Sequence, residues 1–304
     1  MPKLKVFSHP EYSFPLPNGH RFPMGKFEIL RKALLEDQAF QVIEPEPITL
    51  EAVESVHSSD YTERFFAGNL NHKEQRRSGL PWSKQLVRRT LLECGGTYSA
   101  ALESLNSGFS ANAAGGTHHA YPTFASGFCL LNDLSIAAAN LINDNYVKKI
   151  MILDLDVHQG DGTAKIFENN PDVFTVSMHC TENFPAQKQN SDLDLTISKG
   201  SGDPIISEII QNNLPNLITH FNPDLVLYDA GIDVLEQDEL GLLKMTRDGV
   251  FNRDKFIFEL CKKNKIPVSS VIGGGYQKNL EDLAGSHKIV FEAAKFVFGG
   301  NFYS

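Results

Sequence analysis

The sequence predicts a single-domain, three-layer α/β/α fold with a mainly parallel central sheet, covering residues 1–304. Short apolar runs typical of buried strands alternate with longer segments of helical periodicity, which is the pattern of an α/β protein. A chain of 304 residues is long enough to bury one large core. In such folds the carboxyl ends of the strands meet at one edge of the sheet, where we expect the functional site.

Apolar and β-branched runs predict the strands of this sheet. They occupy residues 3–7, 111–115, 149–155, 173–178, 224–229 and 268–272. Because the runs alternate with helical segments, we expect a mainly parallel sheet covered by helices on both faces.

Segments with helical spacing of apolar residues lie between these runs. They occupy residues 27–37, 83–107, 132–143, 162–168, 204–220, 253–263 and 280–296. Three further segments, residues 8–24, 68–82 and 180–202, are rich in Pro, Gly, Asn and charge and predict long loops. Long loops in a compact domain are often functional, so we expect them to form the rim of a pocket.

Composition limits the compartment and the class of partner. No run of about 18 apolar residues occurs, so no membrane span is expected. The segment from Met1 to Phe7 is basic but lacks the apolar core of a Sec-type signal peptide. The four cysteines are far apart and form no CxxC pair, which favours reduced thiols and a cytoplasmic location, with nuclear localisation and non-Sec export left open. The formal charge of −9 argues against direct nucleic-acid binding and suits a basic partner such as a lysine-rich segment.

The most informative motif follows the apolar run at residues 150–153. Asp154, Asp156 and His158 alternate there, and alternate residues of a strand share a face. Three such groups at a strand end indicate a cation site. An ordinary strand-to-helix turn would account for Asp161 and Gly162, but not for the alternating acids.

Four more polar groups follow other predicted strands. His118 and His119 come after a glycine pair, Asp233 follows the run ending at Asp229, and Tyr276 follows three glycines. Ser177 and Met178 end the strand that precedes His179. Their shared position at strand exits predicts that they converge at one edge of the sheet.

These residue types suggest a hydrolytic metal site. Asp156, His158 and Asp233 would supply nitrogen and oxygen ligands and leave a coordination position open, as at a catalytic zinc, although Fe²⁺ or Co²⁺ would also suit this set. Two carboxylate ligands acidify a bound water less than three imidazoles do, so a protein base gains importance.

His118 and His119 can supply that base, with Asp154 and Asp161 available to orient them. Tyr276, freed by its glycines to reach the pocket, would donate its phenol hydrogen to a developing oxyanion. The other histidines lack ligand spacing and are expected to be structural or surface residues, and Cys129 is expected to be a buried thiol.

Taken together, the motifs resemble the zinc-dependent histone deacetylase family, which has the arginase/deacetylase fold. The resemblance covers most of the chain, in the order of the family, and is strongest to its class IV-like branch and bacterial relatives. It lies in GGTHHA at residues 115–120, SGFCLLND at 126–133, DLDVHQGDG at 154–162, TVSMH at 175–179, AGID at 230–233 and GGGY at 273–276.

The resemblance implies hydrolysis of an acyl-lysine amide in a peptide or protein to free lysine and a carboxylate. It implies that Asp156, His158 and Asp233 bind one Zn²⁺ ion. His119 would act as general base and then acid, His118 as an electrostatic partner, and Tyr276 as the donor to the carbonyl oxygen.

The resemblance also implies substrate contacts and a second ion. Gly127, Phe128 and Phe184 would line a tunnel for the acyl-lysine, and Arg21 would lie near an internal channel for the released acid. A structural K⁺ ion would take oxygens from Asp154, Asp156, His158, Ser177 and Met178.

Some positions depart from the family pattern. Thr117 stands where many relatives carry a larger apolar residue, and residues 182–187 replace a familiar loop, so the preferred acyl length, from acetyl to long fatty chains, stays open. Two alternatives also stay open. One is deacylation of small N-acyl amines such as acetylpolyamines, and the other is a non-catalytic metal-binding interaction module, which would be expected to have lost a ligand, the base or the oxyanion donor.

Overall fold

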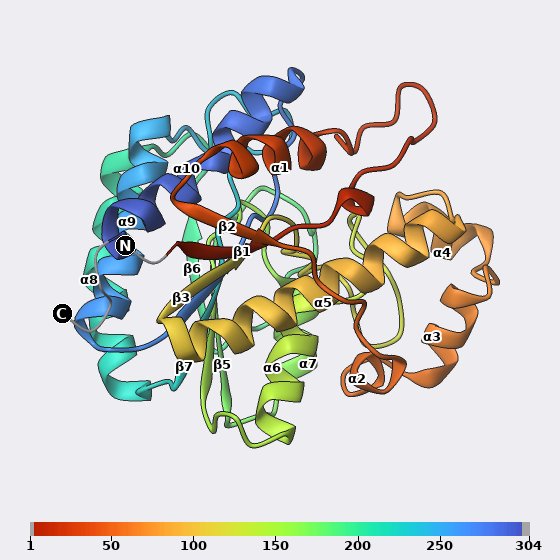
Figure 1. Cartoon of the computed structure of the whole chain (residues 1–304), viewed down its shortest axis with the longest axis horizontal. Coiled ribbons are helices and arrows are strands. Elements are labelled where there is room, and N and C mark those ends of the chain that lie inside the picture. The colour runs from red at the N-terminus through yellow and green to blue at the C-terminus, as the bar shows by residue number, and fades with distance from the viewer. Residues whose placement is uncertain (1–2, 300–304) are drawn as a thin grey trace.

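The computed structural model describes residues 3–299, whose strands form one sheet (Figure 1). The strand order is β2-β1-β3-β8-β7-β4-β5-β6, and every neighbouring pair in the described chain is parallel. The α/β class and the parallel sheet predicted from the sequence are confirmed, while the outer bounds of the predicted domain, residues 1 and 304, lie outside the described part. The strands are β1 (Leu4–Phe7), β2 (Phe40–Ile43), β3 (Phe109–Asn112), β4 (Ile150–Asp154), β5 (Val173–Cys180), β6 (Leu193–Ile197), β7 (Leu225–Asp229) and β8 (Val268–Val271).

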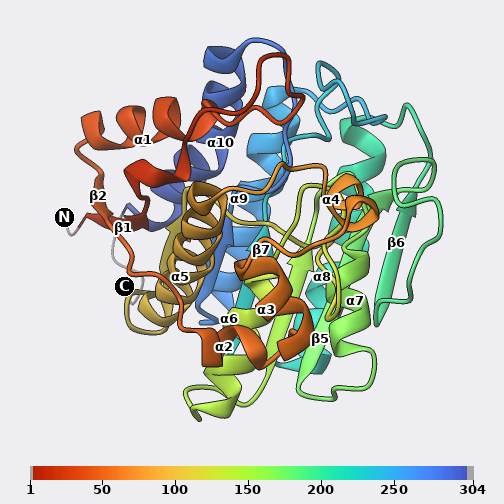
Figure 2. The ribbon, with the colours of Figure 1, turned by 90° about the vertical axis from the view of Figure 1, so that its right-hand side faces the viewer.

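Helices cover both faces of the sheet. Helices α1 (Lys26–Glu36), α8 (Asp203–Phe221), α9 (Arg247–Lys263) and α10 (Leu280–Phe298) lie on one side, and α5 (Lys84–Ser107), α6 (Asp133–Asn143) and α7 (Asp161–Phe167) on the other (Figures 1 and 2). Three short helices, α2 (Leu50–Glu54), α3 (Ser59–Phe66) and α4 (His72–Ser78), lie together beyond one end of α5. The arrangement is the three-layer architecture that the alternating sequence pattern predicts.

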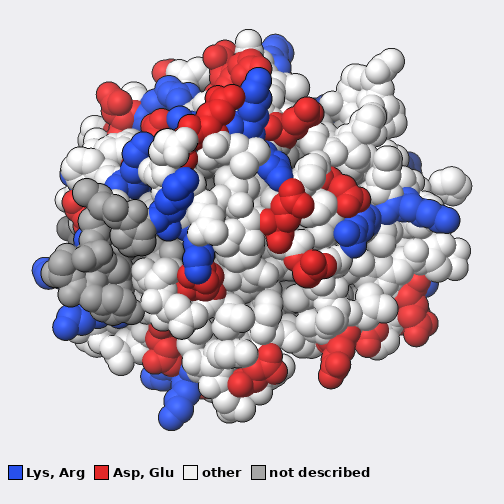
Figure 3. Space-filling view, in the orientation of Figure 1, with Lys and Arg blue, Asp and Glu red and all other residues white. Residues whose placement is uncertain are grey.

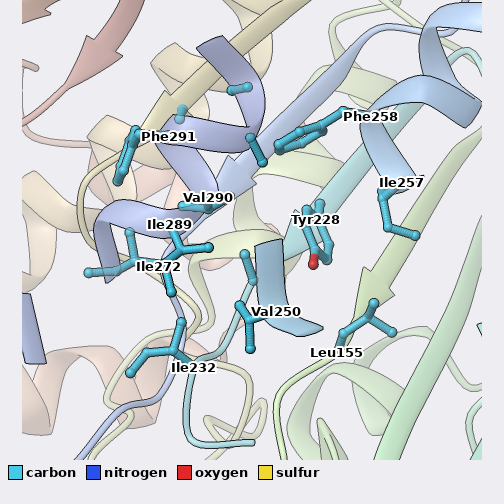
Figure 4. Close-up of a cluster of buried hydrophobic side chains, with 14 of the residues drawn as sticks. Leu155, Tyr228, Ile232, Val250, Ile257, Phe258, Ile272, Ile289, Val290 and Phe291 are labelled. Atoms are coloured by element: carbon cyan, nitrogen blue, oxygen red, sulfur yellow. The ribbon is translucent and has the colours of Figure 1, made fainter. Parts of the chain in front are cut away.

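Burial of apolar side chains on both faces holds the layers together. Between the sheet and α9 and α10, Tyr228 and Phe258 stack edge to face at a centroid distance of 5.9 Å, within the cluster shown in Figure 4. A second cluster packs α6 against the other face through residues such as Leu134 and Leu141. Both faces of β4 and β7 are buried, which explains why these strands read as continuous apolar runs.

The edge strands and the short helices were not predicted from the sequence pattern. β2 and β6 flank the sheet, and β6 carries polar residues inside a segment expected to be a loop. Edge strands are half solvated, so their apolar pattern is weak. Within residues 68–82 the chain forms α4, which Asn71 and Glu74 begin with a reciprocal capping box. α9 also starts earlier than expected, at Arg247, because the side chain of Thr246 caps it.

None of the helices in the described chain is long and apolar enough to cross a membrane. On the molecular face shown in Figure 3, Lys and Arg are interspersed with Asp and Glu, and no broad surface of one sign is visible.

A buried histidine joins the short helices to the segment that leads away from β3. His57 is 2% exposed; its Nδ1 lies 3.0 Å from the carbonyl oxygen of Tyr121, and its Nε2 accepts the backbone N–H of Asn132 at 2.9 Å. Burial lowers the pKa of His57 to about 4, although its backbone partners oppose the shift. The neutral ring, donating from Nδ1 and accepting at Nε2, therefore fits both partners.

This pairing predicts a pH-dependent stability. Because the folded-state pKa of His57 lies below its usual value of 6.5, protonation favours the unfolded chain, and the stabilisation is lost as pH falls from the unfolded toward the folded pKa. Between about pH 7 and pH 5 this group should remove roughly 2 kcal/mol from the free energy of unfolding. Urea denaturation at both pH values should show a smaller pH dependence for His57→Gln than for the wild type. His220→Gln, at an exposed position, is the control; identical pH dependence in His57→Gln and wild type would contradict the assignment.

Candidate metal and catalytic site

The polar groups predicted at strand exits converge because their strands are neighbours in the sheet. Asp154, at the end of β4, lies opposite Ser177 on β5 and Asp229 on β7. The chain beyond β3 carries His118 and His119, and the chain beyond β8 carries Tyr276. The parallel register therefore brings segments that are distant in sequence to one edge of the sheet.

Asp156, His158 and Asp233 form a buried cluster with the spacing of a metal site. Their ligand atoms all lie within 4.8 Å of one another. His158 Nδ1 lies 3.0 Å from Asp156 Oδ1 and 3.1 Å from Asp233 Oδ2. Backbone N–H groups of Gly274 and Val157 donate to the Asp156 and Asp233 carboxylates at 2.8 and 2.9 Å. Both carboxylates are thus fixed in orientation before any ion binds.

The electrostatics of this cluster favour a cation. Burial and the nearby Asp156 raise the pKa of Asp233 to about 7. Burial opposes the charged form of His158, but the two carboxylates outweigh it and raise the pKa of His158 to about 10. Two buried carboxylates need compensating positive charge. One imidazole nitrogen and carboxylate oxygens suit Zn²⁺, Fe²⁺ or Co²⁺, so the residues present fit a divalent metal ion.

Two histidines stand beside this cluster, each paired with its own carboxylate. His118 Nδ1 lies 2.7 Å from Asp154 Oδ2, and His119 Nδ1 lies 2.6 Å from Asp161 Oδ1. The two rings have centroids 4.2 Å apart. Asp161 is further held by the hydroxyl of Tyr121, which donates to its other oxygen at 3.0 Å. Each imidazole is therefore held by one carboxylate, His118 by Asp154 and His119 by Asp161.

The two imidazoles carry different charge. Burial alone would lower the pKa of His118, but Asp154 and Asp156 outweigh it and raise that pKa well above its usual range. Burial and the cationic His118 lower the pKa of His119 to about 4. At neutral pH His118 is therefore protonated, while His119 is neutral and can accept a proton.

Tyr276 reaches the same space through a glycine-rich turn. Its ring centroid lies 6.4 Å from that of His158, and its backbone N–H donates to Asp238 Oδ2 at 2.7 Å. A Cβ atom at Gly274 would lie 2.1 Å from Asp233 Oδ2, so only glycine permits this close approach. Burial raises the pKa of Tyr276 well above its usual range, and the nearby Asp233 adds to the shift. The phenol therefore keeps its hydrogen for donation.

A pocket of about 530 Å³ opens onto these groups. Gly127, Phe128 and Phe184 are among its lining residues, and the Phe184 ring meets the His119 ring edge-on at a centroid distance of 4.8 Å. A Cβ atom at Gly127 would lie 2.6 Å from His119 Cδ2, so a side chain there would displace the imidazole. The lining also includes Leu240 and Leu242, which gives the pocket apolar walls above a polar base.

The structure does not place Arg21 at the site. Arg21 is exposed and does not line the pocket. The buried cation behind Tyr276 is instead Lys26, whose Nζ donates to the carbonyl oxygen of Gly275 at 3.4 Å. Burial lowers the pKa of Lys26 to about 8, with Asp233 opposing the shift. Its helical spacing with Leu30 and Leu34, both buried, was the sequence signal that Lys26 faces inward.

The residues predicted to hold potassium lie on adjacent strands. Ser177 and Met178 are buried on β5, beside Asp154 on β4. Ser177 Oγ accepts from the N–H of Gly160 at 3.4 Å and lies 3.0 Å from His179 Nδ1. The potassium ion itself stays a prediction.

Sequence reasoning assigned no role to Asp229, which lies behind His118. Its Oδ2 is 3.9 Å from His118 Nδ1, and both of its oxygens are buried with no hydrogen-bond partner in the described chain. Burial raises the pKa of Asp229 well above its usual range, and the nearby Asp154 adds to the shift. Its place at the end of an apolar run was visible in the sequence, but nothing there indicated a missing partner.

Comparison with known proteins agrees with this geometry. Residues 20–293 match the model of the histone deacetylase domain. The chain belongs to the histone deacetylase family. The family resemblance predicted from the sequence motifs is therefore confirmed.

Individual relatives place the chain more finely. An uncharacterized protein of Picosynechococcus sp. is 47% identical over 296 residues, covering 96% of this chain and 99% of the relative. Histone deacetylase HDAC1 of Drosophila melanogaster is 29% identical over 280 residues, covering 84% of this chain and 52% of that protein. Histone deacetylase 2 of Arabidopsis thaliana is 30% identical over 190 residues, covering 62% of this chain and 49% of that protein. The chain thus spans about half the length of the histone deacetylases it matches.

A solved structure supports the fold. The crystal structure of the HDA15 HD domain superposes with a TM-score of 0.78 at 22% sequence identity, covering 95% of this chain and 90% of that one. At this identity the likeness shows the arginase/deacetylase-type fold alone.

We predict that the purified deacetylase-family chain binds one divalent ion through Asp156, His158 and Asp233. Asp233→Asn should lower the metal content measured by plasma mass spectrometry after dialysis against a limiting chelator, because an amide binds a divalent ion more weakly than a carboxylate. Asp248→Asn, at an exposed position outside the cluster, is the matched control and should keep the wild-type content. Equal metal content in both variants would exclude this cluster as the site.

Proposed function

We propose that this protein is a metal-dependent amidohydrolase that removes acyl groups from lysine side chains of peptides or proteins. The observation that carries the proposal is the shared pocket base, where Asp156, His158 and Asp233 lie beside a neutral His119 and the Tyr276 phenol. Kinship with the histone deacetylase family supports the same chemistry.

Asp156, His158 and Asp233 would hold the ion, with Zn²⁺ the first candidate and Fe²⁺ or Co²⁺ also suited to the donor set. Bound there, the ion would supply Lewis acidity toward the amide carbonyl and the attacking water. The carboxylate orientation set by Gly274 and Val157 leaves His158 and the two acids facing a common point. Asp154, Asp156, His158, Ser177 and Met178 are proposed to hold a structural K⁺ ion next to this cluster, supported by the pairing of β4 with β5.

His119 is the proposed general base and acid. With Nδ1 engaged by Asp161, its Nε2 is free to take a proton from the water that attacks the acyl carbon. The same proton then passes to the leaving nitrogen as the C–N bond breaks, so lysine departs as an amine and the acyl group as a carboxylic acid. The protonated His118 stabilises negative charge that develops nearby and keeps the pKa of His119 low.

Tyr276 is the proposed donor to the carbonyl oxygen. Its raised pKa keeps the phenol protonated, and the bond from its backbone N–H to Asp238 fixes the turn that carries it. A preorganised donor of this kind stabilises an oxyanion more than the neutral carbonyl, which lowers the barrier rather than merely strengthening binding.

The pocket walls suit the rest of an acyl-lysine. Phe128 and Phe184 offer aromatic surface to an aliphatic stem, and Gly127 keeps the passage beside His119 open. A lysine side chain threaded between them would reach the pocket base with its uncharged amide. Small N-acyl amines such as acetylpolyamines present the same amide and form the competing substrate class.

A substrate panel tests the proposal. The metal-loaded protein is expected to hydrolyse lysine peptides bearing acyl chains between acetyl and myristoyl with a higher kcat/KM than acetylpolyamines, and a chelator should abolish this activity. Amine release measured by mass spectrometry gives the result without a coupled assay. Faster turnover of acetylpolyamines would assign the small-amine function, and no turnover of any amide by metal-loaded protein would refute the hydrolase proposal.

Replacing the proposed catalytic groups should lower the activity and leave the fold unchanged. His119→Ala is expected to lower kcat by about 10²–10⁴, the usual contribution of a positioned base. Tyr276→Phe is expected to lower it by roughly 10²–10³, as for loss of one oxyanion donor. His220→Ala and Tyr146→Phe, at exposed positions, are the matched controls. Circular dichroism should show an unchanged fold, and wild-type kcat in either site variant would remove that residue from the mechanism.

A further inference from the structure

The exposed end of the pocket is bordered by two neighbouring arginines. Arg76 and Arg77 lie in the last turn of α4 and line the same pocket as His119 and Asp156. His119 and Asp156 are only 4% and 1% exposed, whereas the side chains of both arginines are exposed. The arginines therefore mark the mouth of the pocket, and His119 and Asp156 mark its base.

Neither guanidinium has a carboxylate partner within residues 3–299. The one acid on α4, Glu74, is already occupied, because it accepts from Arg64 Nη1 at 2.6 Å and from the N–H of Asn71 at 2.8 Å. On a chain with formal charge −9, two adjacent arginines left unpaired at a pocket mouth form a local cationic surface. Such a surface attracts an anionic group of a ligand.

Arg77 is also held in place for binding. Its Nε donates to the carbonyl oxygen of Ala125 at 3.1 Å, and its guanidinium carbon lies 3.7 Å from the centroid of the Phe124 ring. Its terminal nitrogens have no hydrogen-bond partner in the described chain. A guanidinium fixed in this way loses less conformational entropy when it pairs with a carboxylate.

The same pocket lining includes one exposed acid, Glu182, which forms no ion pair with either arginine in the described chain. Its Oε2 accepts the N–H of Lys199 at 3.0 Å and the thiol of Cys180 at 3.4 Å. Both donors are uncharged, so the Glu182 carboxylate is held in place and keeps its negative charge. It supplies a useful comparison, because it is an exposed pocket-mouth charge of the opposite sign.

We propose that the pocket mouth selects acyl-lysine segments that carry a carboxylate next to the acylated lysine, and that Arg76 and Arg77 bind it. This inference rests on the proposed function and names its substrate class. A carboxylate on the acyl group itself would enter the base of the pocket beside Asp156 and Asp233, so the anionic group belongs to a flanking residue. The extra ammonium groups of a polyamine would meet two guanidiniums, which disfavours that class.

Peptides that differ only beside the acyl-lysine test the inference. The metal-loaded wild type should show a kcat/KM about three- to five-fold higher for Glu-flanked than for Gln-flanked acetyl-lysine peptides at about 50 mM salt, and a smaller ratio at about 500 mM. A Lys-flanked peptide should fall below both. Arg76→Gln should bring the Glu-to-Gln ratio close to one, and Arg77→Lys, which keeps the charge but not the planar fork, should give an intermediate ratio.

Matched controls locate the effect at the mouth. Arg88→Gln removes an exposed arginine outside the pocket, and Glu182→Gln removes the opposite charge at the mouth; the Arg88 variant should keep the wild-type ratio, and the Glu182 variant should not lower it. A succinyl-lysine peptide with Gln flanks and acetylspermidine complete the panel. Preference for either of these over the Glu-flanked peptide would overturn the inference, as would equal turnover of Glu- and Gln-flanked peptides.

A binding measurement separates this inference from the proposed reaction. Fluorescence anisotropy with peptides in which a methyl ketone replaces the acetyl-lysine amide gives the Kd without turnover. An Arg76-dependent preference for Glu flanks in binding, with no hydrolysis of any peptide, would refute the hydrolase function and keep the recognition surface. Hydrolysis without flank preference in either assay would refute the recognition surface and keep the hydrolase function.

Discussion

Two buried carboxylates, Asp156 and Asp233, face one imidazole at the edge of the sheet, and their need for positive charge organises the surrounding structure. Backbone N–H groups of Gly274 and Val157 satisfy the outward oxygens, so the remaining lone pairs are directed at a common point. Burying two carboxylates so close together destabilises the fold unless nearby positive charge compensates them. The glycine turn before Tyr276 follows from the same constraint, because a Cβ at Gly274 would collide with Asp233.

The electrostatic field of the buried carboxylates also determines the protonation states of His118 and His119. His118 lies within reach of Asp154, Asp156 and Asp229 and holds a proton, while His119, one residue later, has a single acid partner and a cationic neighbour. Adjacent positions in the chain thereby acquire opposite protonation states, a division that lets one ring exchange protons while the other keeps a fixed charge. Moving outward, the pocket changes from acidic base to apolar wall to cationic mouth, so each part of a substrate meets a different chemistry.

The sequence predicted the parts of this arrangement that depend on local pattern. The alternation of Asp154, Asp156 and His158 after an apolar run predicted that their side chains share one face of the strand. The parallel sheet then predicted that His118, Asp233 and Tyr276 lie at the same edge, because each follows the end of a strand. Features that depend on long-range packing were not visible. The missing partner of Asp229 is evident only in three dimensions, and β2 and β6 have the weak apolar pattern of edge strands. Arg21 was assigned by resemblance alone, and its side chain is exposed and does not line the pocket.

Anomalous X-ray diffraction from crystals of metal-loaded protein, collected on both sides of the absorption edge of the added ion, tests the central claim most directly. The account predicts one strong peak, bonded to Asp156, His158 and Asp233 at distances of roughly 2.0–2.2 Å, with a coordination position open toward Tyr276 and His119. Absence of any peak among these three side chains, or an ion bound only elsewhere on the molecule, would contradict it.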